Sequence, residues 1–282
     1  MIRSGLLGRS ILSSRSPWLH EQEARAQGVD LDYTLFDFTD RGLDDAELPA
    51  MLARLSDEGF AGVNVTYPFK QMVIPLLDDL SDTAAAVGAV NTVALRDGRM
   101  VGHNTDLTGF RDNLRFTLPD ATLDRVLQLG AGGAGAAVAN ALLSLGVGRL
   151  DLYDIDAERA SLLAGQLAGR YPGQDITVRA PGDCNADTVD GIVNTTPIGM
   201  ASKPGTPINP AQLRTRQWVA DIVYFPLDTA LLQAARARGC ATLDGSGMVV
   251  RQAAMAFEII TGLKADPQRM LRSFAAPTES FL

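Results

Sequence analysis

The chain has 282 residues, which is enough for two domains of ordinary size. Its net charge of −8 at pH 7 argues against a nucleic-acid-binding protein, whose surface would be positively charged. No apolar run approaches the roughly 20 residues of a membrane-spanning helix. We therefore expect no nucleic-acid partner and no membrane insertion.

Cysteine and histidine are scarce. The chain contains Cys184 and Cys240 without a CxxC motif, so neither a disulfide framework nor a thiolate zinc site is expected. This usage suits the reducing cytoplasm. The histidines are His20 and His103, and we place the latter in a loop. With so few ligands, no metal is expected.

The first 19 residues contain three arginines, five serines and no acid, which is typical of a transit peptide. A strand over residues 4–8 is the interpretation that we favour, because a polar cluster discussed below follows directly. Pro17 suits the first position of a helix, and Ser16 would be its N-cap.

Residues from about 1 to 100 alternate between strand and helix patterns. They predict a mostly parallel sheet covered by helices, with a hairpin turn at Asp97-Gly98. The expected elements are strands at 31–38 and 60–65, a helix at 44–58, a helix after Pro68, hairpin strands at 90–95 and 100–101, and a helix at 104–116.

A second alternating region begins with an apolar strand at 125–129 and runs to about residue 243. Helical spacing then resumes at 247–262 and suggests a return to the first domain. The predicted fold class is α/β, with an N-terminal α/β substrate domain, a Rossmann domain and C-terminal helices. The predicted domains are 1–114, 115–246 and 247–282.

A glycine motif follows the strand at 125–129. Residues Gly130, Ala131, Gly132, Gly133, Ala134 and Gly135 form GxGxxG and open a helix, which is the context that dinucleotide binding requires. The first glycine makes a tight turn, the second admits the pyrophosphate and the third lets the helix pack on the strand. The alternative is an ordinary glycine-rich turn.

Asp154 ends the next strand, 19 residues after the motif, where a carboxylate can accept both ribose hydroxyls and would repel a 2′-phosphate. Ile155 and Asp156, which follow, offer no cation, so NAD is the expected cofactor. A helix N-cap is the alternative role, and Asp156 suits it better. Thr195 follows a later strand at the same expected sheet edge, where either a cofactor contact or a plain turn would fit.

Four polar clusters occur after strands or at helix starts, and together they would suit a polyhydroxylated carboxylate ligand. They are residues 13–17, 64–70, 88–92 and 104–106. Only three of the 25 basic residues are lysine, and one of them, Lys70, lies in a cluster. In a chain that otherwise uses arginine, this lysine is a candidate for proton exchange.

These clusters resemble the shikimate/quinate dehydrogenase family over nearly the whole chain. NVTYPFK (64–70) is similar to the family's NVTxPFK, and GAVNT (88–92) matches it outright. HNTDLTGF (103–110) resembles NTDGxGF, and DGSGMVVRQA (244–253) resembles DGxGMLxxQA. Leu107 stands where the family has glycine, which leaves the packing beside Asp106 open.

The resemblance implies roles for individual residues. Lys70 and Asp106 would be the catalytic pair, and Ser14 and Ser16 would hold the substrate carboxylate. Met248 would lie near the nicotinamide. The residues that would bind ring hydroxyls are Asn64, Thr66, Asn91, Tyr224 and Gln252. Each also has a structural interpretation, as a turn, cap or packing residue.

The implied activity is reversible, NAD-dependent oxidation of the C3 hydroxyl of shikimate, with quinate as a further substrate. NADP-using members typically have Asn-Arg-Thr at the second strand end, whereas this chain has Asp154-Ile155-Asp156, as in the NAD-using branch. The alternatives are a dehydrogenase specific for quinate or an amino analogue of shikimate, and a non-catalytic NAD-binding regulator. A homodimer is compatible with the sequence, and the formal base stays open between Lys70 and Asp106.

Overall fold

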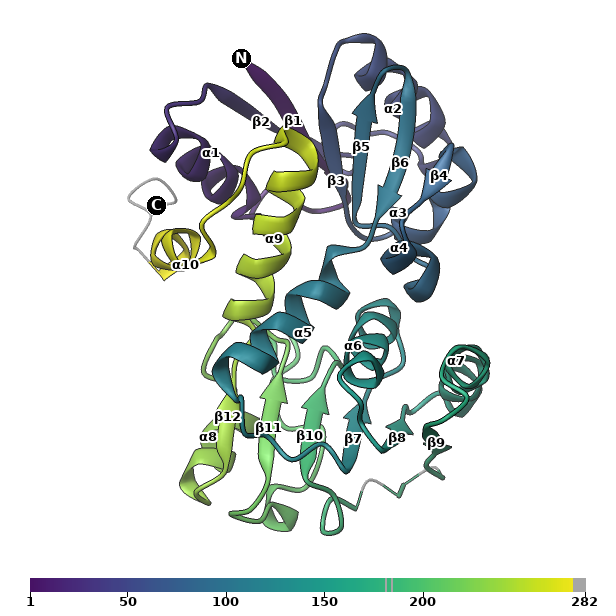
Figure 1. Ribbon diagram of the computed structural model, residues 1–282, viewed down its shortest axis with the longest axis vertical. Helices are drawn as coiled ribbons and strands as arrows, with labels where there is room; N and C mark the ends of the chain where they lie inside the picture. Colours follow the sequence, from purple (N-terminus) through teal and green to yellow (C-terminus); the bar gives the residue numbers. More distant parts are fainter. Residues whose placement is uncertain (181, 184, 276–282) are drawn as a thin grey trace. The chain divides into compact units, whose positions relative to one another are not determined.

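The computed structural model describes residues 1–180, 182–183 and 185–275; Cys184 therefore lies outside the described residues. Contacts divide the chain into two compact units (Figure 1). Unit 1 is Met1–Gly109 together with the chain from Val250 onward, and unit 2 is Phe110–Val249. The functional assignment of domains at 1–114, 115–246 and 247–282 stays a prediction.

Unit 1 is built on a mixed sheet. Its strands lie in the order β2 (Leu31–Asp37), β1 (Ile2–Gly8), β3 (Gly62–Val65), β5 (Thr92–Arg96), β6 (Arg99–His103) and β4 (Asp79–Leu80). Strands β2, β1 and β3 are parallel, and β5 runs antiparallel to both β3 and β6. Asp97 and Gly98 close the β5–β6 hairpin with positive φ angles of 52° and 72°, as the hairpin prediction requires.

Helices complete unit 1. They are α1 (Ser16–Ala26), η1 (Asp45–Glu47), α2 (Leu48–Asp57), α3 (Phe69–Met72), η2 (Ile74–Leu76), α4 (Asp82–Val87) and α10 (Pro267–Ala275). Two longer helices, α5 (Thr105–Thr117) and α9 (Ser246–Thr261), run through the boundaries between the units. None of the helices in the described part of the chain is long and apolar enough to cross a membrane.

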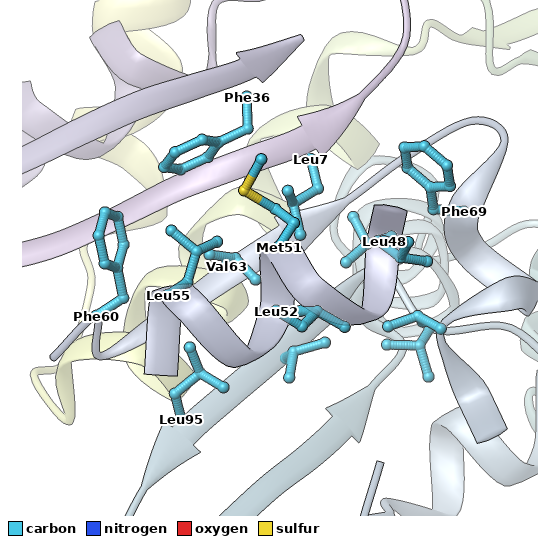
Figure 2. Close-up of a cluster of buried hydrophobic side chains, with 14 of the residues drawn as sticks. Leu7, Phe36, Leu48, Met51, Leu52, Leu55, Phe60, Val63, Phe69 and Leu95 are labelled. Atoms are coloured by element: carbon cyan, nitrogen blue, oxygen red, sulfur yellow. The ribbon is translucent and has the colours of Figure 1, made fainter. Parts of the chain in front are cut away.

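Helix α2 forms part of the core of unit 1. Leu48, Met51, Leu52 and Leu55 recur at the spacing of one helix face and are buried. They belong to one apolar cluster with Leu7, Phe36 and Val63 from the sheet (Figure 2). Burial of each such side chain stabilises the unit by about 1.5–3 kcal/mol.

The C-terminal helix α10 packs on α1, at the opposite end of the sequence. Trp18 Nε1 donates to the Ser273 carbonyl at 3.1 Å, and the buried Glu23 carboxylate accepts from Arg269 at 2.6 Å and 2.8 Å. The predicted return of the C-terminal helices to the first unit is thereby confirmed.

Unit 2 has a fully parallel sheet with the strand order of a Rossmann fold. The order is β12 (Ala241–Leu243), β11 (Trp218–Asp221), β10 (Gly191–Asn194), β7 (Arg125–Leu129), β8 (Arg149–Tyr153) and β9 (Asp175–Val178). Its helices are α6 (Gly133–Ser144), α7 (Ala157–Arg170), η3 (Pro210–Gln212) and α8 (Ala230–Ala237). Strand order reverses between β7 and β10, and ligands of such sheets bind outside the carboxyl ends of the strands at that point.

Several local predictions change. The strand predicted at residues 4–8 forms, and it is longer, at Ile2–Gly8. Ser16 is the first residue of α1 rather than its N-cap, because Arg15 occupies the cap position without a side-chain hydrogen bond. His103 ends β6, so its placement in a loop was wrong: its backbone continues the hairpin ladder opposite Thr92.

Candidate active site

Lys70 and Asp106 form an ion pair within unit 1. Lys70 Nζ lies 2.6 Å from Asp106 Oδ2, and the two side chains are 30% and 13% exposed. Lys70 lies in α3, which follows β3, and Asp106 lies in the first turn of α5, which follows β6. A pair that is this close, and still reachable from solvent, can exchange a proton with a ligand hydroxyl.

The segment before β5 positions both helices of this pair. The Val90 backbone N–H donates to the Lys70 carbonyl at 2.7 Å. Asn104 Nδ2 donates to the Ala89 carbonyl at 3.0 Å, and Asn104 Oδ1 accepts from the Leu107 N–H at 3.2 Å. Asn104 is therefore the residue that fixes the start of α5. Leu107 is buried in the core, so the side chain that replaces the family's glycine is accommodated.

Several of the predicted substrate residues lie at one edge of the unit 1 sheet. Strands β1, β3 and β6 end at this edge, and β5 begins there because it runs the other way. Asn64, in β3, pairs with Thr92 at the start of β5, and Thr92 pairs with His103 at the end of β6. The topology thus brings together clusters that are far apart in the sequence.

One group of these residues surrounds Thr105. Asn91 Nδ2 donates to Thr105 Oγ1 at 3.0 Å, and the Thr105 backbone N–H donates to Asn91 Oδ1 at 2.9 Å. Thr105 Oγ1 also lies 3.2 Å from Gln252 Oε1, on α9. Two of the predicted ring-hydroxyl residues, Asn91 and Gln252, are therefore joined through a threonine that sequence reasoning did not assign.

A second group runs from the serines to Asn64. Ser14 Oγ donates to Ser16 Oγ at 3.1 Å, and Ser16 hydrogen-bonds the Tyr33 hydroxyl. Tyr33 Oη donates to Asn64 Oδ1 at 2.8 Å. Asn64 Nδ2 then donates to Thr92 Oγ1 at 2.9 Å and to the Asn91 carbonyl at 3.2 Å. Together, the two groups form one continuous hydrogen-bonded network, from Ser14 to Gln252.

Tyr33 lies in the middle of this network and is 4% exposed. Its burial raises the pKa of the phenol well above the ordinary value, so the hydroxyl keeps its proton. His20 stacks against it, with ring centroids 4.7 Å apart. Burial lowers the pKa of His20 to about 3, so that ring is neutral at physiological pH.

The glycine motif of unit 2 has the geometry of a phosphate-binding turn. Gly130 adopts a φ of +100°, and a Cβ at Gly135 would lie 2.5 Å from the Gly130 carbonyl oxygen, so both positions need glycine. At Gly132 and Gly133 a Cβ would meet nothing within 4 Å, which leaves the start of α6 open to a ligand. The N–H groups of this helix start suit an anion, so the loop fits a dinucleotide pyrophosphate.

Two polar side chains hold this loop by hydrogen bonds to its carbonyl groups. Gln128, fully buried in β7, donates from Nε2 to the Gly130 and Gly135 carbonyls at 2.9 Å each. Thr195 Oγ1 lies 2.8 Å from the Leu129 carbonyl and 2.9 Å from that of Gly130. Thr195 thus packs on the turn at the strand-order reversal, and its contact with a cofactor stays a prediction.

Asp154 lies beside the glycine loop, just after β8. Its Oδ2 accepts from the Ala131 N–H at 2.7 Å and its Oδ1 accepts from the Asp156 N–H at 2.9 Å. A carboxylate has about four acceptor sites, so capacity remains for ribose hydroxyls. Asp156 caps α7 by accepting from the Arg159 N–H at 3.1 Å, as the sequence suggested.

Arg159 is a cation that sequence reasoning did not consider. Its Nη1 lies 3.8 Å from Asp154 Oδ2, and its Nη2 lies 3.2 Å from Asp156 Oδ2. The nearest chain neighbours of Asp154 carry no positive charge, but the first turn of α7 brings a guanidinium back to the carboxylate. Helical spacing from the Asp156 cap was the available signal.

Three predicted residues have no hydrogen bond with the network of unit 1 among the described contacts. Tyr224 lies in unit 2, after β11, and is 55% exposed. Met248 is buried in the first turn of α9, also in unit 2. Thr66 follows β3, and its methyl group packs against Gly8: a Cβ at Gly8 would lie only 2.5 Å from it. Their predicted contacts with substrate and nicotinamide stay predictions.

Sequence reasoning missed a buried carboxylate three residues before Tyr224. Asp221, at the end of β11, accepts from Thr229 Oγ1 at 2.7 Å, Asn194 Nδ2 at 2.9 Å and the Val223 N–H at 3.0 Å. Burial raises the pKa of this carboxyl. The bonds fix the turn that leads to Tyr224. A lone Asp that ends an apolar strand was the only sequence signal.

Metal ligands do not gather in the described part of the chain: it contains no group of three or more His, Cys, Asp or Glu side chains placed to hold an ion.

Comparisons with known proteins point to one family. The family described as "Shikimate dehydrogenase substrate binding domain" matches residues 6–93. A protein of Pseudarthrobacter chlorophenolicus named shikimate dehydrogenase (NADP(+)) is 50% identical, over 96% of this chain and 93% of its own. One of Corynebacterium efficiens named quinate/shikimate dehydrogenase (NAD(+)) is 46% identical, over 96% of both chains.

A solved structure extends the likeness to three dimensions. Quinate dehydrogenase from Corynebacterium glutamicum in complex with NAD superimposes with a TM-score of 0.93 at 42% identity, over 97% of this chain and 98% of that one. Since likeness of this kind covers both units and nearly every residue, the chain belongs to the shikimate/quinate dehydrogenase family.

Proposed function

We propose that this protein is an NAD-dependent dehydrogenase that reversibly oxidises the C3 hydroxyl of shikimate to a ketone and also accepts quinate. The observation that carries the proposal is the Lys70–Asp106 pair at 2.6 Å, in the same unit as a network of hydroxyl and amide side chains. A ring that carries several hydroxyls and one carboxylate matches that set of donors and acceptors.

Lys70 and Asp106 would manage the proton of the reacting hydroxyl. Oxidation removes a hydride from C3 and a proton from its oxygen, and bound NAD supplies the acceptor for the hydride. Lys70 and Asp106 already share a hydrogen bond, so a proton taken from the substrate by one can be accommodated by the pair. Which of them is the formal base stays open, since the pair can titrate as a unit.

The remaining polar residues would orient the substrate. Ser14 and Ser16 are the two hydroxyls at one end of the network and suit a carboxylate. Asn64, Asn91 and Gln252 carry amides that can both donate to and accept from ring hydroxyls. Thr66 and Tyr224 are further candidates, as the family resemblance implies.

NAD rather than NADP is the proposed cofactor, held by the loop from Gly130 to Gly135, with Thr195 and Met248 as further contacts. Asp154 is 8% exposed and fixed by two backbone N–H groups, so it cannot easily swing away from a 2′-phosphate. Relatives that are named for NAD and for NADP are about equally similar to this chain. The local geometry of Asp154 therefore decides the proposal.

Quinate as the preferred substrate is the second candidate, because the protein of the structure with a TM-score of 0.93 is named quinate dehydrogenase. A non-catalytic NAD-binding regulator would have no need for the Lys70–Asp106 pair. Initial rates with shikimate and with quinate, each with NAD and with NADP, separate these functions. We expect the highest kcat/KM with shikimate and NAD; NAD binding without turnover of either acid would contradict the proposal.

A further inference from the structure

We infer that Tyr33 is a positioning residue for substrate binding: its hydroxyl holds Asn64 in one orientation and leaves the Ser16 hydroxyl available to a ligand carboxylate. The inference rests on the proposed function for the identity of the ligand. Tyr33 belongs to none of the motifs that carry the family resemblance, and its proposed role rests on its contacts in the structure.

The orientation of the Asn64 amide depends on Tyr33. Asn64 is buried, its Nδ2 donates to Thr92 Oγ1 and the Asn91 carbonyl, and its Oδ1 accepts from Tyr33 Oη at 2.8 Å. Without the phenol hydroxyl, the amide oxygen would lose this buried donor, and the amide would rotate to seek another. Tyr33 therefore sets which face of Asn64 offers an acceptor and which a donor.

The direction of the hydrogen bonds leaves the hydroxyls of Ser14 and Ser16 able to donate to a ligand. Tyr33 has one proton and gives it to Asn64, so Ser16 must be the donor in its bond with Tyr33. When the Ser16 hydroxyl donates to a ligand carboxylate instead, the Tyr33 oxygen loses one donor. The Tyr33 hydroxyl still donates to Asn64. Ser14, which donates to Ser16, can turn to the same carboxylate. Binding thus leaves no buried donor unsatisfied.

The setting of Tyr33 makes it rigid. The ring is buried and stacked at 4.7 Å on the neutral His20, which itself lies 6.1 Å from the Phe257 ring. Such packing fixes the position of the hydroxyl. Tyr33 has no hydrogen bond with Lys70 or Asp106 among the described contacts, so its effect should fall on substrate binding rather than on proton transfer.

The test is Tyr33→Phe, which keeps the ring. We expect the KM for shikimate to rise about tenfold, with kcat within about twofold and the KM for NAD unchanged. The matched control is Tyr171→Phe, which removes a partly buried hydroxyl bonded to Asn140 in unit 2. It should leave both KM values unchanged, and thermal melts of both variants measure any cost in stability.

A double-mutant cycle shows whether Tyr33 acts through Asn64. In an Asn64→Ala background, Tyr33→Phe should raise KM by much less than in the native protein, because the side chain that it holds is absent. Full additivity, an unchanged KM in Tyr33→Phe, or an equal fall in kcat would overturn the inference. Failure of the proposed function is distinguishable, because the native protein would then turn over neither acid.

Discussion

Lys70 and Asp106 are 36 residues apart in the sequence, and a single short segment ties their helices together. The Ala89 carbonyl accepts a hydrogen bond from the side chain of Asn104, the residue just before the helix of Asp106. The backbone N–H of Val90, which follows Ala89, donates to the carbonyl of Lys70. The 2.6 Å ion pair is thus supported by a backbone hydrogen bond on the Lys70 side and by a side-chain-to-backbone hydrogen bond on the Asp106 side. Under the proposed function, such a pair would be preorganised for proton transfer before the ligand binds.

Lys70→Ala should lower kcat roughly 10²-fold or more with a smaller effect on KM, because the proton-transfer partner is lost in the transition state. Lys70→Arg should not restore activity, since arginine keeps the charge but does not exchange its proton usefully. Steady-state kinetics measure both variants, and Lys264→Arg, at an exposed lysine of unit 1, is the control. Near-normal kcat in Lys70→Arg would make Lys70 an electrostatic clamp.

Replacement of both Ser14 and Ser16 by alanine should raise the KM for shikimate and leave kcat nearly unchanged. These contacts are expected to be equally strong in the ground state and the transition state. The matched control is the double alanine variant of Ser144 and Ser161, whose hydroxyls donate to helix carbonyls in unit 2. If the KM of the Ser14 and Ser16 variant equals that of the native protein, the serines belong to the loop alone.

The preference between NAD and NADP should depend on the charge at residues 154 and 155. Asp154→Asn with Ile155→Arg removes the carboxylate that repels a 2′-phosphate and adds a cation, so preference should shift toward NADP by about tenfold or more. The measured quantity is the ratio of kcat/KM for NAD to that for NADP. Asp120→Asn, at an exposed loop carboxylate of unit 2, controls for the loss of one negative charge.

Arg159→Ala should move the same ratio in the other direction. Its guanidinium lies 3.8 Å from Asp154 and offers a 2′-phosphate some attraction, so its loss should sharpen the preference for NAD. A higher relative rate with NADP in this variant would mean that Arg159 serves only to orient Asp154.

Stability should fall as the pH drops below about 6.5, because of His20. The pKa of His20 falls from 6.5 to about 3 on burial, so between these values the unfolded chain binds more protons than the folded one. From about pH 7.5 to about pH 5 the loss should be about 2 kcal/mol from this group. His20→Phe keeps a ring against Tyr33 and cannot be protonated.

Urea unfolding of the native protein and of His20→Phe at these two pH values checks the prediction. The variant should lose clearly less free energy of unfolding between them. The pKa of His103 is also lowered by burial, but this histidine is present in both proteins and cancels in the comparison. Equal losses in the two proteins would show that His20 does not control the acid sensitivity.

Much of the fold could be predicted because its signals are local. The strand at 125–129 is followed by glycines that only a tight turn explains, and α2 shows one buried face at regular spacing. The exact start of α1 could not be predicted, since Ser16 has the residue type of a cap but turns its hydroxyl to Ser14 and Tyr33. Tertiary contacts thus overrode a local preference.

The candidate site was predictable where motifs carry it and not where packing does. Lys70 and Asp106 could be paired only through the family resemblance, and the structure brings them together. Tyr33, Thr105 and Asp221 look like ordinary strand and helix residues in the sequence. Their importance comes from what lies beside them in space, such as Asn64 for Tyr33 and Gln252 for Thr105. Arg159 was missed because it reaches Asp154 across a helical turn.

The central claim is that this protein removes a hydride from C3 of shikimate. The most direct test uses shikimate that carries deuterium at C3, incubated with the native protein and NAD, followed by mass spectrometry of both products. The account predicts that the deuterium is found in the reduced nicotinamide and is absent from the oxidised acid. Deuterium that stays in the acid or is released to water would contradict it.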